Sequence, residues 1–210
     1  MKVFDLSLYL VTDRRFLKNR LLNDVILEAI DGGVTMVQLR EKECPENEFF
    51  SLAESLHKIL LPLNIPLIIN DNPAVALAAN SEGVHLGARD ISAATAREML
   101  GPGAIIGYSY DFKQTHSLKN VDYIGVGPIF PTKTKIDAQT PLKINGLTLI
   151  CKKFDLPAIA IGGIEPQHIS EVFNAGAKGI AVVSGILAHD NIFASAERYS
   201  REIDQWRKNV

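Results

Sequence analysis

Short runs of apolar and β-branched residues recur along the whole chain. Several of them are apolar at successive positions, as expected for parallel strands that are covered on both faces. Because each run is short and bounded by polar or glycine-containing segments, we predict a strand at each. The eight predicted strands cover residues 8–12, 34–39, 66–69, 83–86, 104–108, 123–126, 158–161 and 179–183.

Segments with helical spacing separate these runs. Residues 21–30 carry apolar side chains at Leu22, Val25, Ile26 and Ala29, which lie on one face of a helix. Further helices are predicted at residues 49–60, 169–175 and 192–206. Strand–helix alternation indicates a parallel sheet, and eight units close a barrel. We therefore predict the α/β class, with a single (β/α)8 TIM barrel over residues 1–210. A doubly wound open sheet is the alternative, but no GxGxxG motif follows the first strand.

Composition and charge exclude several classes of protein. The formal net charge is −2, which argues against a nucleic-acid partner. The chain has no apolar run of about 18 residues, so we expect no membrane span. Its start is interrupted by Asp5 and Asp13, and we interpret it as a strand and not a signal peptide. Cys44 and Cys151 form no metal or redox motif, which favours reduced thiols in the cytoplasm. Both a monomer and a homo-oligomer are compatible with the sequence.

Polar residues stand where the second strand ends. In a barrel the chemistry lies at the carboxyl ends of the strands. Alternation places Gln38, Arg40 and Lys42 on one face, so an amide and two cations would converge at the barrel mouth. A strand end with solvated charges is the alternative.

Two carboxylates follow the next two strands. Asp71 comes after the third strand and its Asn70, and Asp90 comes after the fourth. Such a pair, completed by phosphate oxygens and water, suits Mg²⁺. Each aspartate could instead cap the helix that follows it. His85, within the fourth strand, is either a hydrogen-bonded core residue or a ligand contact, and no partners at zinc spacing accompany it.

The later loops carry groups suited to phosphate. Ser109 ends the fifth strand, where it could meet a phosphate oxygen or cap a helix. The loop over residues 127–135 begins with two prolines and ends with Thr132, Thr134 and Lys135, which suit a diphosphate. Glycine-containing loops follow strands seven and eight, at Gly163 and Ser184. We expect their backbone N–H groups, together with the helix that Pro166 opens, to hold a second phosphate.

Seven segments in this order resemble the thiamine-phosphate synthase family: YLVTDR, GVTMVQLREK, IIND, GVHLG, VGPIFPTKTK, AIGGI and AVVSGI. The resemblance spans residues 8–187, and the QLREK, IND and PTxTK segments are its specific parts. It implies an enzyme that joins 4-amino-2-methyl-5-hydroxymethylpyrimidine diphosphate to hydroxyethylthiazole phosphate and releases pyrophosphate.

The resemblance also implies a role for each matched residue. Gln38, His85 and Tyr9 would adjoin the pyrimidine, and Asp71 and Asp90 would hold Mg²⁺. The diphosphate would be surrounded by Arg40, Lys42, Asn70, Ser109 and Lys135. The thiazole phosphate side would comprise Thr132, Thr134, Gly163, Val183 and Ser184. The reaction that it implies is a dissociative substitution, in which the protein neutralises the charge of the leaving pyrophosphate.

The sequence departs from the family pattern at two places, and three other functions are compatible with parts of it. Ala88 stands where the family has an amide, and Tyr110 and Asp111 replace a short polar stretch. Both departures bear on substrate fit and rate. The alternatives are a thiazole tautomerase, a non-catalytic phosphate-ligand-binding paralogue and a sugar-phosphate epimerase. Asn70, Asp71 and the PTKTK segment argue against the tautomerase, and charged residues on five loops argue against the paralogue. The QLREK strand end and the PTKTK segment fit a diphosphate better than the monophosphate of an epimerase substrate.

Overall fold

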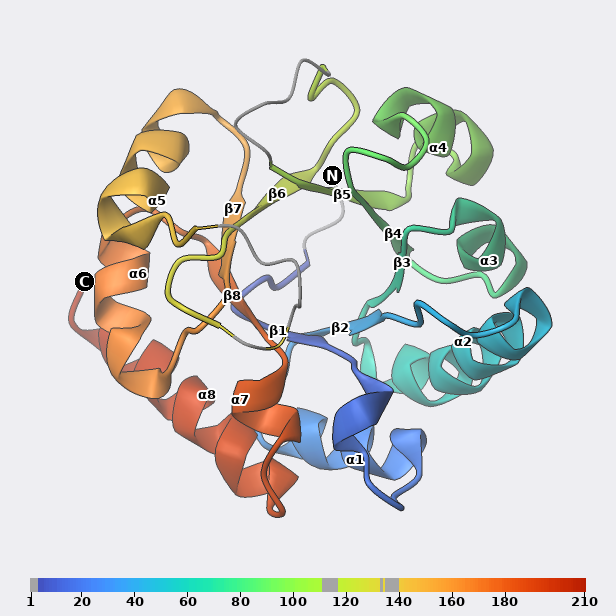
Figure 1. Cartoon of the computed structure of the whole chain (residues 1–210), viewed down its shortest axis with the longest axis horizontal. Helices are drawn as coiled ribbons and strands as arrows, with labels where there is room; N and C mark the ends of the chain where they lie inside the picture. The colour runs from blue at the N-terminus through green and yellow to red at the C-terminus, as the bar shows by residue number, and fades with distance from the viewer. Residues whose placement is uncertain (1–3, 111–116, 133, 135–139) are drawn as a thin grey trace.

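The chain folds into a closed barrel of eight parallel strands with helices around it (Figure 1). The structure is a computed structural model, and it describes residues 4–110, 117–132, 134 and 140–210. Each strand pairs with the next one in the chain, and β8 pairs with β1 through Leu8 and Ile180. This closure confirms the predicted (β/α)8 barrel and shows that the open-sheet alternative is wrong.

The strands lie where the hydrophobic runs predict them, with small shifts at their ends. The second strand begins at Met36, two residues later than predicted, and the third and fifth are shifted by one residue. The strands are β1 (Leu8–Val11), β2 (Met36–Leu39), β3 (Leu67–Asn70), β4 (Gly83–Leu86), β5 (Ile105–Ser109), β6 (Tyr123–Val126), β7 (Ala158–Ile161) and β8 (Gly179–Val182).

The helices follow the amphipathic segments. The second helix starts at Glu46, earlier than predicted, and its first turn carries Glu46 and Glu48, whose negative charges suit a helix N-terminus. The α-helices are α1 (Leu22–Asp31), α2 (Glu46–Leu60), α3 (Pro73–Ala78), α4 (Ala93–Leu100), α5 (Lys143–Lys153), α6 (Ile169–Asn174), α7 (Ser184–Leu187) and α8 (Ile192–Lys208). Short 3₁₀ helices are η1 (Arg14–Phe16), η2 (Leu61–Leu63) and η3 (Pro166–His168).

Alternation along the strands divides the core into two parts. One set of side chains packs between strands and helices. The other set fills the barrel interior, and its members are Leu6, Tyr9, Val11, Met36, Ile68, Ile105, Tyr123, Ile159 and Ala181. Phe4 packs against this interior cluster just ahead of β1. The described helices include none that is long and apolar enough to cross a membrane, and both cysteines are free thiols.

Candidate active site

A continuous series of hydrogen bonds crosses the barrel interior. The Gln38 Nε2 atom donates to the Tyr9 hydroxyl at 2.8 Å, and that hydroxyl lies 3.0 Å from the hydroxyl of Tyr123. The Tyr123 oxygen lies 3.0 Å from Nδ1 of His85, and Nε2 of His85 lies 2.9 Å from Oγ of Ser109. Four of the predicted site residues are therefore joined, through a fifth residue that sequence reasoning missed. Tyr123 opens β6 and belongs to the inward-facing cluster. Alternation along the strand indicates that it faces inward, but not which side chains it meets.

Two glycines leave room for the rings in this series. A Cβ atom on Gly107 would lie 2.1 Å from Cζ of Tyr123 and 2.5 Å from Nδ1 of His85. A Cβ atom on Gly125 would lie 3.2 Å from Cε1 of His85. Any side chain at Gly107 would therefore displace the tyrosine and the histidine, so the glycine is what lets both rings occupy the interior.

Burial also sets the protonation state of the imidazole. Loss of solvent lowers the pKa of His85 to about 4, and the charge of Asp71 opposes this only in part. The ring is therefore neutral at pH 7, with one nitrogen that donates and one that accepts. His85 is therefore a hydrogen-bonded residue that reaches Ser109 at the rim, and its contact with a ligand stays a prediction.

The cationic segment comprises residues 40–42, directly after the end of β2 at Leu39. The backbone N–H of Arg40 donates to Oγ1 of Thr12 at 2.9 Å, which ties the start of this loop to the end of β1. Nζ of Lys42 lies 2.5 Å from Oδ2 of Asp71. The structure thus brings Lys42 to the carboxylate that follows the neighbouring strand, and a purely solvated lysine is excluded.

Neither aspartate caps a helix. Asn72 is the N-cap of α3, where its side chain accepts from the Val75 N–H, and Ser92 is the N-cap of α4. Asp71 has a left-handed backbone, with φ of 63°, and its N–H donates to the carbonyl of His85 at 2.8 Å. Oδ2 of Asp90 accepts from the Gly87 N–H at 2.7 Å. Both capping alternatives are wrong, and both carboxylates are left at the barrel mouth.

The two carboxylates influence each other's ionisation. Burial opposes the charge on Asp71, but the hydrogen bond and charge of Lys42 outweigh it and lower the pKa of Asp71. Burial and the nearby Asp71 raise the pKa of Asp90. Burial and the charge of Asp71 thus disfavour ionisation of Asp90, and a divalent cation beside the two carboxyl groups would favour the ionised form of both. Among the described residues no group of three or more His, Cys, Asp or Glu side chains could hold a metal ion.

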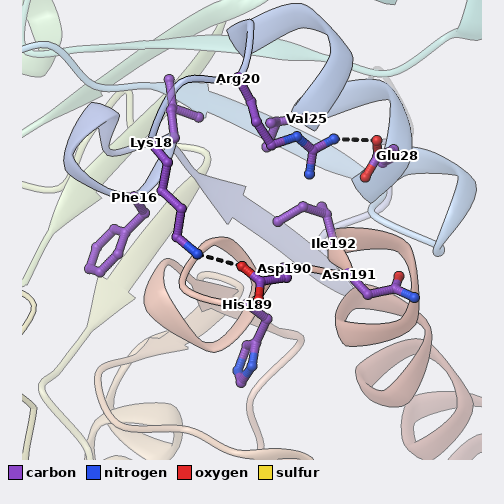
Figure 2. A pocket seen from close by; sticks show the side chains of 10 residues that line it. Phe16, Lys18, Arg20, Val25, Glu28, His189, Asp190, Asn191 and Ile192 are labelled. Carbon is purple, nitrogen blue, oxygen red and sulfur yellow. Dashed lines mark hydrogen bonds and ion pairs between the residues drawn. The ribbon is translucent and has the colours of Figure 1, made fainter.

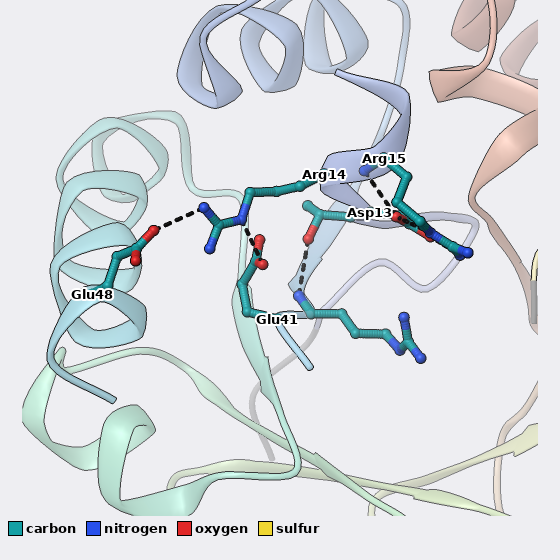
Figure 3. Close-up of polar contacts among 7 residues, drawn as sticks. Asp13, Arg14, Arg15, Glu41 and Glu48 are labelled. Atoms are coloured by element: carbon teal, nitrogen blue, oxygen red, sulfur yellow. Dashed lines mark hydrogen bonds and ion pairs between the residues drawn. The ribbon is translucent and has the colours of Figure 1, made fainter. Parts of the chain in front are cut away.

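Ion pairs of Arg14 join the segment after β2 to η1 and to α2 (Figure 3). Arg14 bridges two carboxylates, with Nε 2.7 Å from Glu41 and Nη1 2.8 Å from Glu48. The Glu41 side chain is only 7% exposed, and burial raises its pKa although Arg14 opposes the shift. Since Glu41 stands between Arg40 and Lys42 in the sequence, Arg14 holds the middle of the segment that carries both cations.

Thr134, in the loop after β6, forms hydrogen bonds with two other parts of the chain. Oγ1 of Thr134 lies 2.9 Å from Oγ of Ser184, and its carbonyl accepts from Nη2 of Arg15 at 2.8 Å. Arg15 is itself paired with Asp13 (Figure 3). The Thr134 N–H donates to Oγ1 of Thr132 at 3.3 Å. The two predicted threonines and Ser184 are therefore brought together, whereas Lys135 lies outside the described residues.

The glycine loop after β7 lies against the loop after β6, which carries Thr132 and Thr134. Gly163 has φ of 64°, and a Cβ atom there would lie 2.5 Å from the Pro131 carbonyl, so only glycine fits this close approach. Val183 follows β8 and packs against the interior cluster.

The helix opened by Pro166 is the short 3₁₀ helix η3, and a capping box joins Glu165 and His168 at its start. The Glu165 N–H donates to Nδ1 of His168 at 3.1 Å. The anion-binding role expected of this helix stays a prediction.

Two cavities lie on or near this rim. One, of about 370 Å³, is lined by Lys42, Asn70 and Asp71 together with Glu41 and Pro73, so it coincides with predicted site residues. A larger one, of about 460 Å³, lies between the η1–α1 segment and the start of α8 (Figure 2). Its Lys18 pairs with Asp190 and its Arg20 with Glu28. None of its lining residues belongs to the predicted site, and the pairing of these charges argues against an anion site there.

Comparison with known proteins agrees with this geometry. The family described as thiamine monophosphate synthase matches residues 8–186. A thiamine-phosphate synthase from Azorhizobium caulinodans is 44% identical over 98% of each chain, and one from Clostridium botulinum is 43% identical over 90% of this chain and 94% of its own. The structure of a thiamine phosphate pyrophosphorylase from Pyrococcus furiosus superposes with a TM-score of 0.83 at 30% identity, covering 96% of this chain and 97% of that one. The chain therefore belongs to the thiamine monophosphate synthase family.

Proposed function

We propose that the chain is a transferase that joins 4-amino-2-methyl-5-hydroxymethylpyrimidine diphosphate to hydroxyethylthiazole phosphate, giving thiamine phosphate and pyrophosphate. The observation that supports it most is the group formed by Lys42, Asp71 and Asp90 at the ends of three adjacent strands. Their mixed charge suits a diphosphate that arrives with a divalent cation.

The reaction needs a stabilised leaving group and not a strong base. The bond between the pyrimidine methylene carbon and the diphosphate oxygen breaks, and both electrons go to the oxygen. The thiazole nitrogen then forms the new C–N bond with its lone pair. Arg40 and Lys42 offer positive charge to the departing pyrophosphate, and on sequence grounds Lys135 adds a third cation. Gln38, Tyr9 and His85 lie deeper in the barrel, where a pyrimidine ring would be shielded from water.

We propose that Asp71 and Asp90 hold Mg²⁺. When bound, the ion supplies positive charge to the diphosphate oxygens. The raised pKa of Asp90 beside Asp71 supports this assignment, because a cation would favour the ionised form of both groups. Mg²⁺ is commonly held by one or two carboxylates plus substrate oxygens. Before a metal ion binds, the ammonium of Lys42 neutralises the Asp71 carboxylate.

The other substrate is assigned to the loops after β6, β7 and β8. The hydroxyls of Thr134 and Ser184 lie 2.9 Å apart, and Gly163 brings its backbone against Pro131. With Thr132 nearby and the backbone of Val183, these groups offer hydrogen-bond donors for a single phosphate.

The three competing functions are less well supported. A thiazole tautomerase needs a proton-transfer residue and no diphosphate site, whereas the carboxylate pair and Lys42 are in place. A non-catalytic paralogue has no need for charges retained on several loops. The relatives described above carry the synthase name over nearly their full lengths, which also disfavours a sugar-phosphate epimerase.

An assay of pyrophosphate release with both substrates tests the proposal. We expect release only when both substrates and Mg²⁺ or Mn²⁺ are present, and its loss in excess chelator. Asp71→Asn should reduce turnover on the order of 10²–10³-fold, as when a group that stabilises developing charge is removed. Asp24→Asn, on the exposed face of α1, is the matched control and should leave turnover unchanged. Full turnover in chelator would refute the metal assignment.

We further propose a cytoplasmic location. Two free cysteines support it, since disulfides are rare in that compartment.

A further inference from the structure

We propose that Tyr123 is a positioning residue that acts through His85 to make the Ser109 hydroxyl a hydrogen-bond donor toward the barrel mouth. The inference rests on the proposed function, because the acceptor at the mouth is the substrate diphosphate. It assigns a role to a buried side chain that makes no contribution of its own charge to the reaction.

The first bond of the series, from Gln38 to Tyr9, determines which atom donates in each of the later hydrogen bonds. The amide nitrogen of Gln38 can only donate, so the Tyr9 oxygen accepts from it. The single proton of Tyr9 is then paired by donation to the Tyr123 oxygen, 3.0 Å away. Tyr123 has accepted one bond, and its own proton is directed to Nδ1 of His85, also at 3.0 Å.

The same reasoning fixes the tautomer of the imidazole. Because Nδ1 accepts from Tyr123, the one proton of a neutral ring lies on Nε2. That N–H donates to Oγ of Ser109 at 2.9 Å. The serine oxygen has now accepted a bond from below, and its own proton is free to point outward. Ser109 is exposed at the end of β5, so the proton faces the mouth.

This direction matters because a diphosphate oxygen only accepts hydrogen bonds. If the series ran the other way, Ser109 would donate to His85 and turn its lone pairs toward the leaving group. The present direction offers a donor that strengthens as negative charge develops on the departing oxygen. Tyr123 enforces it, since it is the donor that keeps Nδ1 unprotonated.

The surrounding packing keeps the series in register. Tyr9 and Tyr123 are at most 1% exposed, and their rings meet edge to face at 6.1 Å. Gly107 and Gly125 leave space for the rings of Tyr123 and His85. Burial and close packing thus hold both tyrosine hydroxyls within reach of the partners named above.

The tautomer can be measured without substrate. Long-range ¹⁵N–¹H correlation spectra of histidine-labelled protein distinguish the Nε2–H form from the Nδ1–H form, and His85→Gln identifies the signal. We expect the Nε2–H form in the wild type and its loss or mixing in Tyr123→Phe. Tyr199→Phe removes another buried hydroxyl, which bonds to the Ile164 carbonyl, and should leave the His85 signal unchanged. An Nδ1–H form in the wild type would overturn the proposal.

Kinetics separate positioning from direct contact. Tyr123→Phe should lower turnover about tenfold, the size of one hydrogen bond, with a smaller change in the Michaelis constant for the diphosphate. In a Ser109→Ala background the same substitution should have no further effect, because its action passes through the serine. An undiminished effect in that background, or wild-type turnover of Tyr123→Phe, would contradict the inference. Absence of pyrophosphate release by the wild type would instead refute the proposed function, and the spectra would still report on the tautomer.

Discussion

Glu41 combines burial, charge and an unsatisfied atom. Its Oε2 pairs with Arg14 at 2.7 Å, while its Oε1 has no hydrogen-bond partner in the described part of the chain. A buried carboxylate with one bare oxygen is costly, and Arg14 is the group that offsets most of the cost. Because Arg40 and Lys42 flank Glu41, any movement that relieves Glu41 also moves the cations of the proposed site.

Arg14→Gln should therefore affect both stability and catalysis. It leaves Glu41 without a charged partner, and we expect a loss of about 2 kcal/mol in the free energy of unfolding. We also expect roughly a tenfold fall in kcat/KM, equivalent to about 1.4 kcal/mol of misplaced charge. Chemical denaturation and steady-state kinetics measure the two effects.

Glu48→Gln is the matched control for Arg14→Gln. Glu48 is 48% exposed, and an exposed ion pair contributes little to stability. Its substitution should leave both stability and kcat/KM close to wild type. Equal effects of the two substitutions would mean that the support comes from Glu48 and not from the buried Glu41.

The strands were largely predictable, and the reason lies in their burial on both faces. Continuous apolar runs such as residues 158–161 admit few other interpretations in a chain of alternating elements. The start of α2 was less predictable, because Glu46 and Glu48 break the apolar spacing while their charges favour the first helical turn. The capping role of Glu165 was missed for a similar reason, since local hydrogen bonds to a backbone leave no periodic pattern.

The placement of Gln38, Asn70 and His85 was predictable because alternation fixes which side chains of a strand share a face. Tyr123 was missed because an inward tyrosine looks the same as any core aromatic in a sequence. Its partners come from β1 and β4, and only the register of the closed barrel, in which Gly107 lies beside Tyr123, brings them together. Lys135 is placed by sequence alone.

Gly107→Ala should test how tightly β5 and β6 hold the interior series. The new methyl group would meet Tyr123 at 2.1 Å within a strand that cannot shift freely. Overpacking of this kind costs about 1–3 kcal/mol, and we expect a loss of stability in that range. Gly103→Ala is the control: a Cβ atom there meets nothing within 4 Å, so its stability should stay close to wild type. A neutral Gly107→Ala would show that the rings can move aside.

Closure by β1 and β8 makes the two ends of the chain depend on each other. Leu8 to Leu10 pair with Ile180 to Val182, and α8 lies against α1 and α6 beside that seam (Figure 1). Trp206, near the end of α8, lies 4.8 Å from the ring of Phe173 and donates from Nε1 to Asn174 at 2.9 Å. No part of such a ring has a complete core by itself, which favours a single domain over residues 1–210.

We predict that the whole chain unfolds as one unit. Trp206 is the single tryptophan, so its emission reports on the packing of α8, whereas far-ultraviolet circular dichroism reports on all helices. The two transitions in denaturant should coincide. Trp206→Phe identifies the emission. An emission change that precedes the loss of helix would show that α8 separates first, and would argue against one cooperative domain.

Because side chains fill the interior below the proposed site, a ligand can reach that site only from the mouth of the barrel. Phe4 and Leu6 lie at the amino-terminal end, and Met36, Ile68, Ile105 and Ile159 fill the space between that end and the mouth. Both substrates have to come in, and both products have to go out, through the same rim of loops. A product that is still bound at this rim therefore blocks the entry of the next substrate.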